Sequence, residues 1–334
     1  MRSIKKARIT GTGLSVPPRV VTNDDLAKIM ETSNEWILQR TGIRERRHVD
    51  PGTTPTDLAE IACRKALDAA HVRVEDIDLL LVATLSPQHY FPGTCAFLQD
   101  RLRMGTTPSL DLRAQCSGFV YGLNVARAMI ESGTYKKILL CGVEIQSRAL
   151  DMSSEGRETA VLFGDGAGAV VIEAGENPEF GIMNVVLHSE GAYADKLWVE
   201  APSNVESKAI DYAMLDRRAH IPKMEGKVVF KNAVVRLPQV VMETLAPFHL
   251  SPKDIDMFVF HQANLRINEH VAGSLGISAE RCFNNIDRFG NCSAASIPIC
   301  LDEAVRGGRI KDGSLVCVAA FGSGFTWGGA LIRW

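Results

Sequence analysis

Short, continuous apolar runs alternate with longer amphipathic stretches along this chain. The runs have the length of buried β-strands, and the stretches carry apolar residues at the three- and four-residue spacing of helices. In order, the first half predicts helix 57–69, strand 79–84, helix 94–103, strand 108–112, helix 117–132 and strand 137–143. Because continuous apolar strands between amphipathic helices are typical of sheets covered on both faces, we expect a largely parallel sheet in an α/β fold.

Two helix starts carry capping signals. Asp57 and Glu60 stand at the spacing of an N-cap residue and its N3 partner, and Thr32 and Glu35 show the same spacing earlier in the chain. The second pair predicts a helix that begins at Ser33.

Trp36 and Arg40 lie four residues apart on this second helix and therefore on one face. An indole beside a guanidinium can hold a planar base or a phosphate. A partly buried tryptophan next to an ordinary surface arginine fits the same spacing, and the spacing alone favours that simpler interpretation.

The two halves of the chain repeat one another. The segment 74–82, VEDIDLLLV, matches the segment 252–260, PKDIDMFVF. The helix and strand that follow Cys116 match those that follow Asn291, at a nearly equal offset along the chain. Matching patterns in the same order indicate a duplicated chain.

We therefore expect two α/β halves, 1–175 and 176–334, packed together with pseudo-twofold symmetry. The stretch 188–226 departs from the pattern, because it is polar, charged and weakly periodic. We interpret it as an insertion over the site or as a subunit contact.

The composition narrows the class of protein. Of 334 residues, 46% are hydrophobic and 23% are charged, with a net charge of −2, so no basic field favours nucleic acid or an anionic membrane. The start lacks the apolar block of a signal peptide, and no apolar run is long enough to span a bilayer. The 8 cysteines form no CxxC pair with histidine support, which argues against a metal site and a disulfide framework. We expect a soluble, cytoplasmic protein.

Cys116 is the first candidate for chemistry. It lies where the apolar run 108–112 has ended and the helix 117–132 begins. Unpaired backbone N–H groups and the positive end of the helix dipole meet at such a point, and both favour thiolate over thiol. Most cysteines in an apolar chain are small core residues, so position alone does not make Cys116 a nucleophile.

His261 and Asn291 supply two partners. His261 directly follows the apolar strand 258–260, and Asn291 stands at the start of the helix that carries Ser296. By the repeat, Asn291 takes the place in the second half that Cys116 takes in the first. Since ligands bind at the carboxyl edge of open α/β sheets, we expect the three side chains to converge there.

The segments around these residues resemble one known family, the β-ketoacyl-acyl carrier protein synthase III branch of the thiolase-fold condensing enzymes. The similar motifs are WILQRTGIRERR at 36–47, RAQCSGF at 113–119, FGDGAGAVV at 163–171, HQANLRI at 261–267, RFGNCSAAS at 288–296 and FGSGFTWGGALIRW at the C-terminus. The resemblance covers essentially the whole chain.

This resemblance implies a thiolase-like fold, in which two duplicated α/β halves form five layers, αβαβα. It also implies a decarboxylative Claisen condensation that initiates fatty-acid synthesis. Cys116 would take an acyl group from an acyl-CoA primer, and a malonyl thioester, on acyl carrier protein or on CoA, would then lose CO2 and supply the enolate. CoA thioesters are the substrates, so no cofactor or metal is implied, and the protein is expected to be a homodimer.

The residue types suit this chemistry. Loss of CO2 builds negative charge on a thioester oxygen, and His261, as neutral imidazole, and Asn291 can both donate N–H to it. By resemblance, a second oxyanion hole would use the backbone N–H groups of Cys116 and Ser323.

Other roles rest on the resemblance alone. The adenine of CoA would lie between Trp36 and Arg40, with Arg157 as a further arginine. The pantetheine tunnel would use Thr32, Gly226 and Asn264, Phe91 would cross the dimer interface to close the partner's acyl pocket, and Lys231 and Arg266 would contact a carrier protein.

Several positions depart from the family pattern. Ser323 stands where glycine is usual, and Gly273 and Ser274 occupy places often held by lysines of the carrier-protein patch. Gln115 and Ser117 flank the nucleophile where alanines are common. The carrier of the extender and the identity of the primer therefore stay open.

Other functions compete with fatty-acid initiation. One is a specialised condensing or acyl-transferring relative that serves a secondary metabolite. A second is a degradative thiolase, which needs a second cysteine such as Cys292, but that side chain should point away from the site into the core. The third is a non-enzymatic binding protein, against which an intact Cys-His-Asn set argues.

Overall fold

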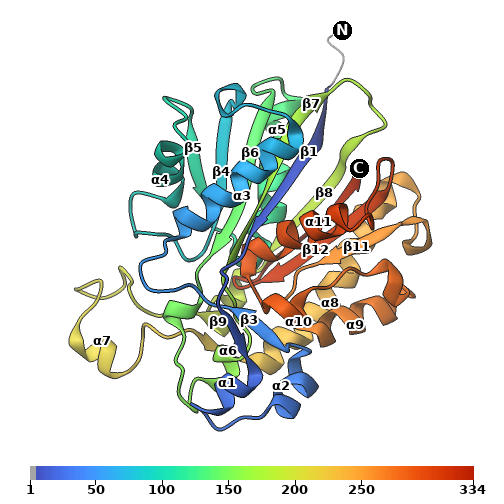
Figure 1. The fold of residues 1–334 in the computed structure, drawn as a ribbon. Coiled ribbons are helices and arrows are strands. Elements are labelled where there is room, and N and C mark those ends of the chain that lie inside the picture. The colour runs from blue at the N-terminus through green and yellow to red at the C-terminus, as the bar shows by residue number, and fades with distance from the viewer. Residues whose placement is uncertain (1–4) are drawn as a thin grey trace.

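The computed structural model describes residues 5–334 and contains two mixed β-sheets (Figure 1). The first has the order β1-β7-β6-β4-β5, formed by Lys6–Ser15, Gly166–Gly175, Lys137–Glu144, Leu79–Ala83 and Ser109–Leu112. The second has the order β11-β12-β13-β8, formed by Met257–Phe260, Leu315–Gly322, Thr326–Arg333 and Gly181–Ser189.

The parallel pairs lie at one end of each sheet, next to the edge strands β5 and β11. β4 pairs in parallel with β5 and β6, and β11 with β12, whereas β1, β7, β13 and β8 run antiparallel to their neighbours. The prediction of a largely parallel sheet is therefore wrong in part. A strand buried on both faces has the same continuous apolar pattern whichever way it runs.

Helices form three layers around these sheets. The outer layers are α3 and α4 (Pro55–Ala70, Thr94–Arg101) and α8 and α9 (Gly226–Leu245, Leu265–Leu275), and the middle layer is α5 and α11 (Gly118–Glu131, Ser296–Arg306). Successive residues of a strand point to opposite faces, so Leu81 of β4 packs in the middle layer and Leu80 packs against α3. The predicted five-layered αβαβα arrangement is confirmed.

The duplication has a single offset along the chain. β4 and β11 begin at positions 79 and 257, β6 and β12 at 137 and 315, and α5 and α11 at 118 and 296. The same offset pairs Cys116 with Ala294, so the predicted equivalence of Cys116 and Asn291 is wrong. The residues just before them, Gln115 and Ser293, share an unusual left-handed backbone, with φ of 45° and 46°. The smaller offset inferred from the sequence came from the loop after α11. A loop tolerates changes in length that a strand does not.

The helix α3 begins before its predicted N-cap. Thr54 caps it by accepting from the N–H of Asp57, and Asp57 in turn accepts from the N–H of Thr54. Asp57 is therefore the N3 residue of a capping box rather than the cap itself. Pro55 explains the shift, because proline favours the first helical position.

The helix α2 (Asn34–Thr41) is capped by Ser33, whose Oγ accepts from the N–H of Trp36 at 3.1 Å. The predicted cap, Thr32, lies one residue outside. Thr32 and Ser33 both carry a hydroxyl that could cap the helix. Ser33 is the cap because its backbone has the extended conformation that this position requires.

Small elements gather below the sheets, where α2 lies (Figure 1). They are α1 (Asn23–Ala27), β2 (Val20–Thr22), β3 (Glu45–Arg47), α6 (Arg157–Ala160) and α10 (Ile286–Phe289). The fully buried Arg46 joins three of these segments by donating to Val21 O, Asn23 Oδ1 and Val161 O. Arg46 thereby links β2, α1 and the end of α6.

The irregular stretch after β8 has two parts. β9 (Leu197–Trp198) pairs with β10 (Lys223–Met224), and Leu197 and Met224 line the cavity described below. Between them, α7 (Tyr212–Asp216) sits on an arm that projects from the body (Figure 1). Within residues 5–334, no helix combines the length and the apolar character needed to cross a membrane.

Candidate active site

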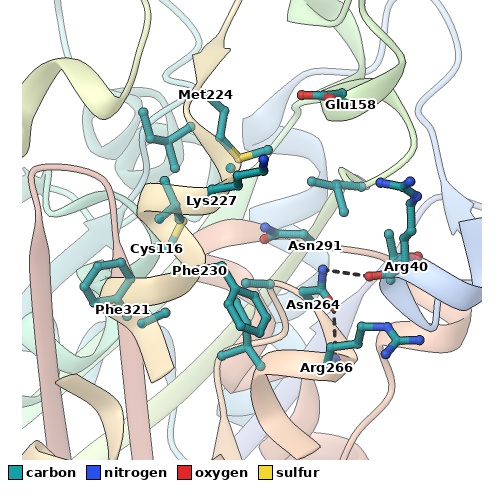
Figure 2. A pocket seen from close by; sticks show the side chains of 18 of the residues that line it. Arg40, Cys116, Glu158, Met224, Lys227, Phe230, Asn264, Arg266, Asn291 and Phe321 are labelled. Atoms are coloured by element: carbon teal, nitrogen blue, oxygen red, sulfur yellow. Dashed lines mark hydrogen bonds between the residues drawn. The ribbon is translucent and has the colours of Figure 1, made fainter. Parts of the chain in front are cut away.

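Cys116, His261 and Asn291 line one cavity of about 950 Å³, to which both halves of the chain contribute. Figure 2 labels Cys116 and Asn291 in this cavity. Their exposed fractions are 6%, 3% and 5%, so all three side chains are nearly removed from bulk water. Segments that are distant in the sequence thus supply the three groups to one enclosed space.

Cys116 lies in a short turn, Gln115–Ser117, between β5 and α5. The end of β12 packs against it so closely that a Cβ on Gly322 would lie 2.9 Å from Cys116 Cβ. Only glycine allows this approach. The next residue, Ser323, brings its backbone N–H within hydrogen-bonding reach of the Cys116 sulfur, and the N–H of Cys116 itself lies there too.

The serine at position 323, where glycine is usual in the family, leaves the turn intact. Ser323 does not have a positive φ; Gly324 does, at 133°. A side chain at 323 is therefore tolerated, and its hydroxyl donates to Leu197 O. The backbone donor expected at this position is retained.

The resting Cys116 is a thiol. Burial raises its pKa to about 11, and hydrogen bonds from Ser293 and from the N–H groups of Cys116 and Ser323 offset burial only in part. The backbone donors at the helix start lower the pKa of Cys116, as the sequence indicated, but they do not make it a resting thiolate. Loss of water around the sulfur outweighs the nearby dipoles, so the proton must leave during attack.

His261 follows β11 directly, and its backbone N–H donates to Ala319 O at 2.8 Å. Neither ring nitrogen has a hydrogen-bond partner among residues 5–334. Burial lowers the pKa of His261 to about 3, so the imidazole is neutral near pH 7. A neutral ring with both nitrogens free can donate one N–H into the cavity.

Asn291 is held by its backbone and by its amide oxygen. Its N–H donates to Leu162 O at 2.8 Å, and its carbonyl accepts from the N–H of Gly164 at 3.0 Å. Its Oδ1 accepts from the N–H of Ser293 at 2.8 Å, which leaves the Nδ2 hydrogens as donors toward the cavity. The carboxamide is therefore oriented as a hydrogen-bond donor.

The outer part of the cavity is cationic and aromatic. The Trp36 ring has the Arg40 guanidinium carbon 4.5 Å and the Arg157 guanidinium carbon 5.1 Å from its centroid. Asn264, the N-cap of α9, donates from Nδ2 to Arg40 O at 3.1 Å, a bond drawn in Figure 2. Gly226, the first residue of α8, lines the same wall.

The remaining predicted residues differ in how close they lie to the cavity. Thr32 is outside the cavity lining, and its hydroxyl is buried without a partner among the described residues. Phe91 is 81% exposed on the surface and does not reach the cavity of its own chain. Lys231 is exposed on α8, whereas Arg266 lies at the cavity mouth and donates from Nε to Gln39 O.

Cys292 does not line the cavity. It is buried in a cluster with Phe289, Ala295 and Ile299, and its Sγ lies 3.5 Å from Phe289 O. Its sulfur therefore packs in the core, as the sequence predicted, and a second catalytic cysteine is not available from this residue.

Two residues near Cys116 were not identified from the sequence. Ser293 Oγ lies 3.6 Å from Cys116 Sγ, and Glu144 is a fully buried carboxylate at the end of β6, with a backbone N–H of the Ser293 turn nearby. The signal for Glu144 was a single acid that ends the otherwise uncharged stretch 138–144. The signal for Ser293 was its place in the repeat, where it is the counterpart of Gln115.

The arrangement favours acyl transfer through a cysteine. It combines a buried sulfur, two backbone donors beside it, and two side-chain N–H donors that face the same space. Among the described residues, no group of three or more His, Cys, Asp or Glu side chains could ligate a metal ion.

Comparison with known proteins points in the same direction. The family description "3-Oxoacyl-[acyl-carrier-protein (ACP)] synthase III" matches residues 110–191, and its C-terminal part matches residues 245–334. The chain is 48% identical over 330 residues to the β-ketoacyl-[acyl-carrier-protein] synthase III of Alkalilimnicola ehrlichii, covering 98% of this chain and 99% of that protein. It is 46% identical over 329 residues to the enzyme of the same name from Methylococcus capsulatus, covering 98% and 99%.

A solved structure agrees. The crystal structure of 3-oxoacyl-[acyl-carrier-protein] synthase III from Aquifex aeolicus superposes with a TM-score of 0.90 at 39% sequence identity, over 98% of this chain and 100% of that chain.

Proposed function

The chain belongs to the 3-oxoacyl-[acyl-carrier-protein] synthase III family, and from this premise we propose how its cavity performs the condensation. It is an acyltransferase of the condensing type that initiates fatty-acid synthesis. An acyl-CoA primer is joined to a malonyl thioester, and CO2 is released. The observation that carries the proposal is the shared cavity of Cys116, His261 and Asn291.

In the first half-reaction, Cys116 Sγ attacks the thioester carbonyl of the primer. Negative charge moves to the carbonyl oxygen, where the backbone N–H groups of Cys116 and Ser323 donate hydrogen bonds. CoA leaves, and the acyl group stays on the sulfur as a thioester. Each such donor is worth about 10²–10³ in rate, because it is fixed in place before charge develops.

In the second half-reaction, a malonyl thioester binds and loses CO2. The electron pair of the broken bond moves toward the thioester oxygen, which accepts N–H from His261 and Asn291. Neither donor carries a full charge, so the site stabilises the enolate without protonating it. The enolate carbon then attacks the acyl-Cys116 thioester and releases the β-ketoacyl product.

The outer cavity suits a CoA thioester. Trp36 offers a flat indole, and Arg40 and Arg157 place positive charge beside it, which fits an adenine and its phosphates. Asn264 and Gly226 line the passage from there toward Cys116, where a pantetheine arm would run. Thr32 precedes the Ser33 cap of α2 and is not part of the cavity lining.

The expected partners follow from this assignment. The extender is malonyl-acyl carrier protein, for which Lys231, exposed on α8, and Arg266, in the cavity lining, would provide cations. The working form is a cytoplasmic homodimer. Phe91, with its exposed ring, would close the acyl pocket of the partner. No cofactor or metal takes part in the reaction.

A primer panel tests the function. Acetyl-CoA, longer straight-chain and branched acyl-CoAs are each combined with malonyl-acyl carrier protein or malonyl-CoA, and CO2 and β-ketoacyl product are measured. We expect product with a short acyl-CoA and malonyl-acyl carrier protein. Product from malonyl-CoA alone would favour the secondary-metabolite alternative, and acetoacetyl-CoA cleavage without condensation would favour a thiolase.

A further inference from the structure

The proton of Cys116 needs an acceptor. The resting group is a thiol, whereas attack on a thioester requires the sulfur lone pair of a thiolate. His261 is a weak base in this cavity, because burial lowers its pKa to about 3. The acceptor must therefore be another group that the sulfur can reach.

Ser293 contacts both Cys116 and Asn291. Its Oγ lies 3.6 Å from Cys116 Sγ, and its backbone N–H donates to Asn291 Oδ1 at 2.8 Å. It is fully buried, and its left-handed backbone, with φ of 46°, is a conformation that a serine rarely adopts. The turn is thus held by its surroundings in a shape that aims the hydroxyl at the sulfur.

Glu144 lies behind this hydroxyl. Its carboxylate accepts from Ser86 Oγ at 2.5 Å, from the N–H of Leu85 at 3.2 Å and from the N–H of Ala294, the residue after Ser293, at 3.4 Å. The side chain of Ser293 is near enough to lower the pKa of Glu144. All these neighbours donate, so they satisfy an ionised carboxylate. Burial nevertheless raises the pKa of Glu144 to about 7, because these donors offset the loss of water only in part, and that value makes it a better proton acceptor than His261.

We propose that Ser293 is a catalytic residue of the first half-reaction and that it passes the thiol proton of Cys116 to the carboxylate of Glu144. The inference rests on the proposed function, which makes Cys116 the nucleophile. A hydroxyl can accept one proton as it gives up its own, and its hydrogen rotates to either neighbour.

The step balances in atoms and charge. The thiol proton moves to Ser293 Oγ as the Ser293 hydroxyl proton moves to Glu144. The sulfur lone pair forms the bond to the thioester carbon, the carbon–sulfur bond to CoA breaks, and the CoA sulfur leaves with the electron pair. That sulfur takes the proton back from Glu144 through Ser293, so CoA leaves as a thiol and Glu144 is ionised again.

The main test is Ser293→Ala in the full-length protein. Single-turnover acetylation by acetyl-CoA, followed by intact mass, should slow about 100-fold, within the range of general base catalysis. Decarboxylation of malonyl-acyl carrier protein by enzyme that has first been fully acetylated should stay within about twofold. The reason is that alanine keeps the backbone N–H that orients Asn291, and decarboxylation moves no thiol proton. The matched control is Ser117→Ala, a buried serine beside Cys116 whose Oγ bonds to Ala114 O and Thr326 instead of the sulfur.

A pH profile of Glu144→Gln is the second readout. In the wild type, the acetylation rate should rise with pH and level off above about pH 7, as Glu144 becomes ionised. The titratable groups that face it are the thiols of Cys116 and Cys292, with Asp165 beyond Gln146. In Glu144→Gln that rise should disappear, and the rate should instead climb toward the higher pKa of the thiol.

Three outcomes would overturn the relay. They are acetylation by Ser293→Ala within about twofold of the wild type, equal slowing of both half-reactions, or an unchanged pH profile in Glu144→Gln. If the wild type itself takes no acyl group, the proposed function fails. Alkylation of Cys116 by iodoacetamide then tests the relay alone, because it too requires loss of the thiol proton. That alkylation should slow in Ser293→Ala but not in Ser117→Ala, and equal rates in the two variants would contradict the relay.

Discussion

Acid should destabilise this protein through His261. The imidazole is 3% exposed and has no hydrogen-bond partner among residues 5–334, so protonation in the folded state would bury an unpaired charge. Its pKa falls from 6.5 to about 3 on folding. Between these values the unfolded chain binds a proton that the folded chain does not, so stability is complete above about pH 6.5 and is lost as the pH falls toward 3.

The size of this effect follows from the two pKa values. One pKa unit corresponds to about 1.4 kcal/mol, so lowering the pH from 7 to 5 should cost about 2 kcal/mol of unfolding free energy through His261 alone. His261→Gln removes the titrating group. The free energy lost by the wild type between pH 7 and pH 5 should then exceed the loss in His261→Gln by about 2 kcal/mol, the same linkage contribution.

Urea unfolding at both pH values and one protein concentration measures the difference. The buried His48, whose pKa burial also lowers, contributes to the wild type and the variant alike, so it cancels. His270→Ala is the matched control, because this imidazole is exposed and keeps its hydration on folding. Equal losses in the wild type and His261→Gln would refute the neutral, dehydrated imidazole and with it the role of His261 as an uncharged donor.

Three further perturbations probe other parts of the site. Asn291→Ala should lower malonyl decarboxylation by about 10²–10³ and leave acyl-enzyme formation measurable, as CO2 release and intact mass would record; equal loss of both steps would contradict separate oxyanion sites. Trp36→Ala should raise KM for acyl-CoA about tenfold with little change in kcat, in line with the loss of one stacked base, and an unchanged KM would favour a structural tryptophan. Gly322→Ala places a Cβ 2.9 Å from that of Cys116, so it should lower the free energy of unfolding by about 1–3 kcal/mol and slow acylation, and wild-type behaviour in both would show that the approach is not tight.

Much of the fold could be predicted from local patterns. Strand and helix order followed from apolar periodicity, and the duplication predicted that Cys116 and His261 follow strands in related halves. Strand direction could not be predicted, because β7 and β13 are buried on both faces and their apolar runs do not record it. The helix starts were misplaced for a related reason: Thr32 and Ser33 before α2, and Thr54 and Asp57 before α3, can all act as caps until the backbone conformation selects one.

The candidate site could be predicted from the sequence only in part, for a different reason. The residue types at 116, 261 and 291 indicated their chemistry, but the ionisation of Cys116 depends on burial, which the helix start does not reveal. Glu144 was missed because it belongs to no motif, and Ser293 was missed because, within RFGNCSAAS, only Asn291 was given a role. They matter through distances between β6, the turn before α11 and the turn before α5, and only the folded chain brings these together.

The most direct test of the account is the site of acylation. The protein is incubated with acetyl-CoA, digested and analysed by peptide mass, with Cys116→Ala treated in parallel. The account predicts one acetyl group on the peptide that contains Cys116 and none in the variant. An acetyl group on another cysteine such as Cys292, or labelling that persists in Cys116→Ala, would contradict it.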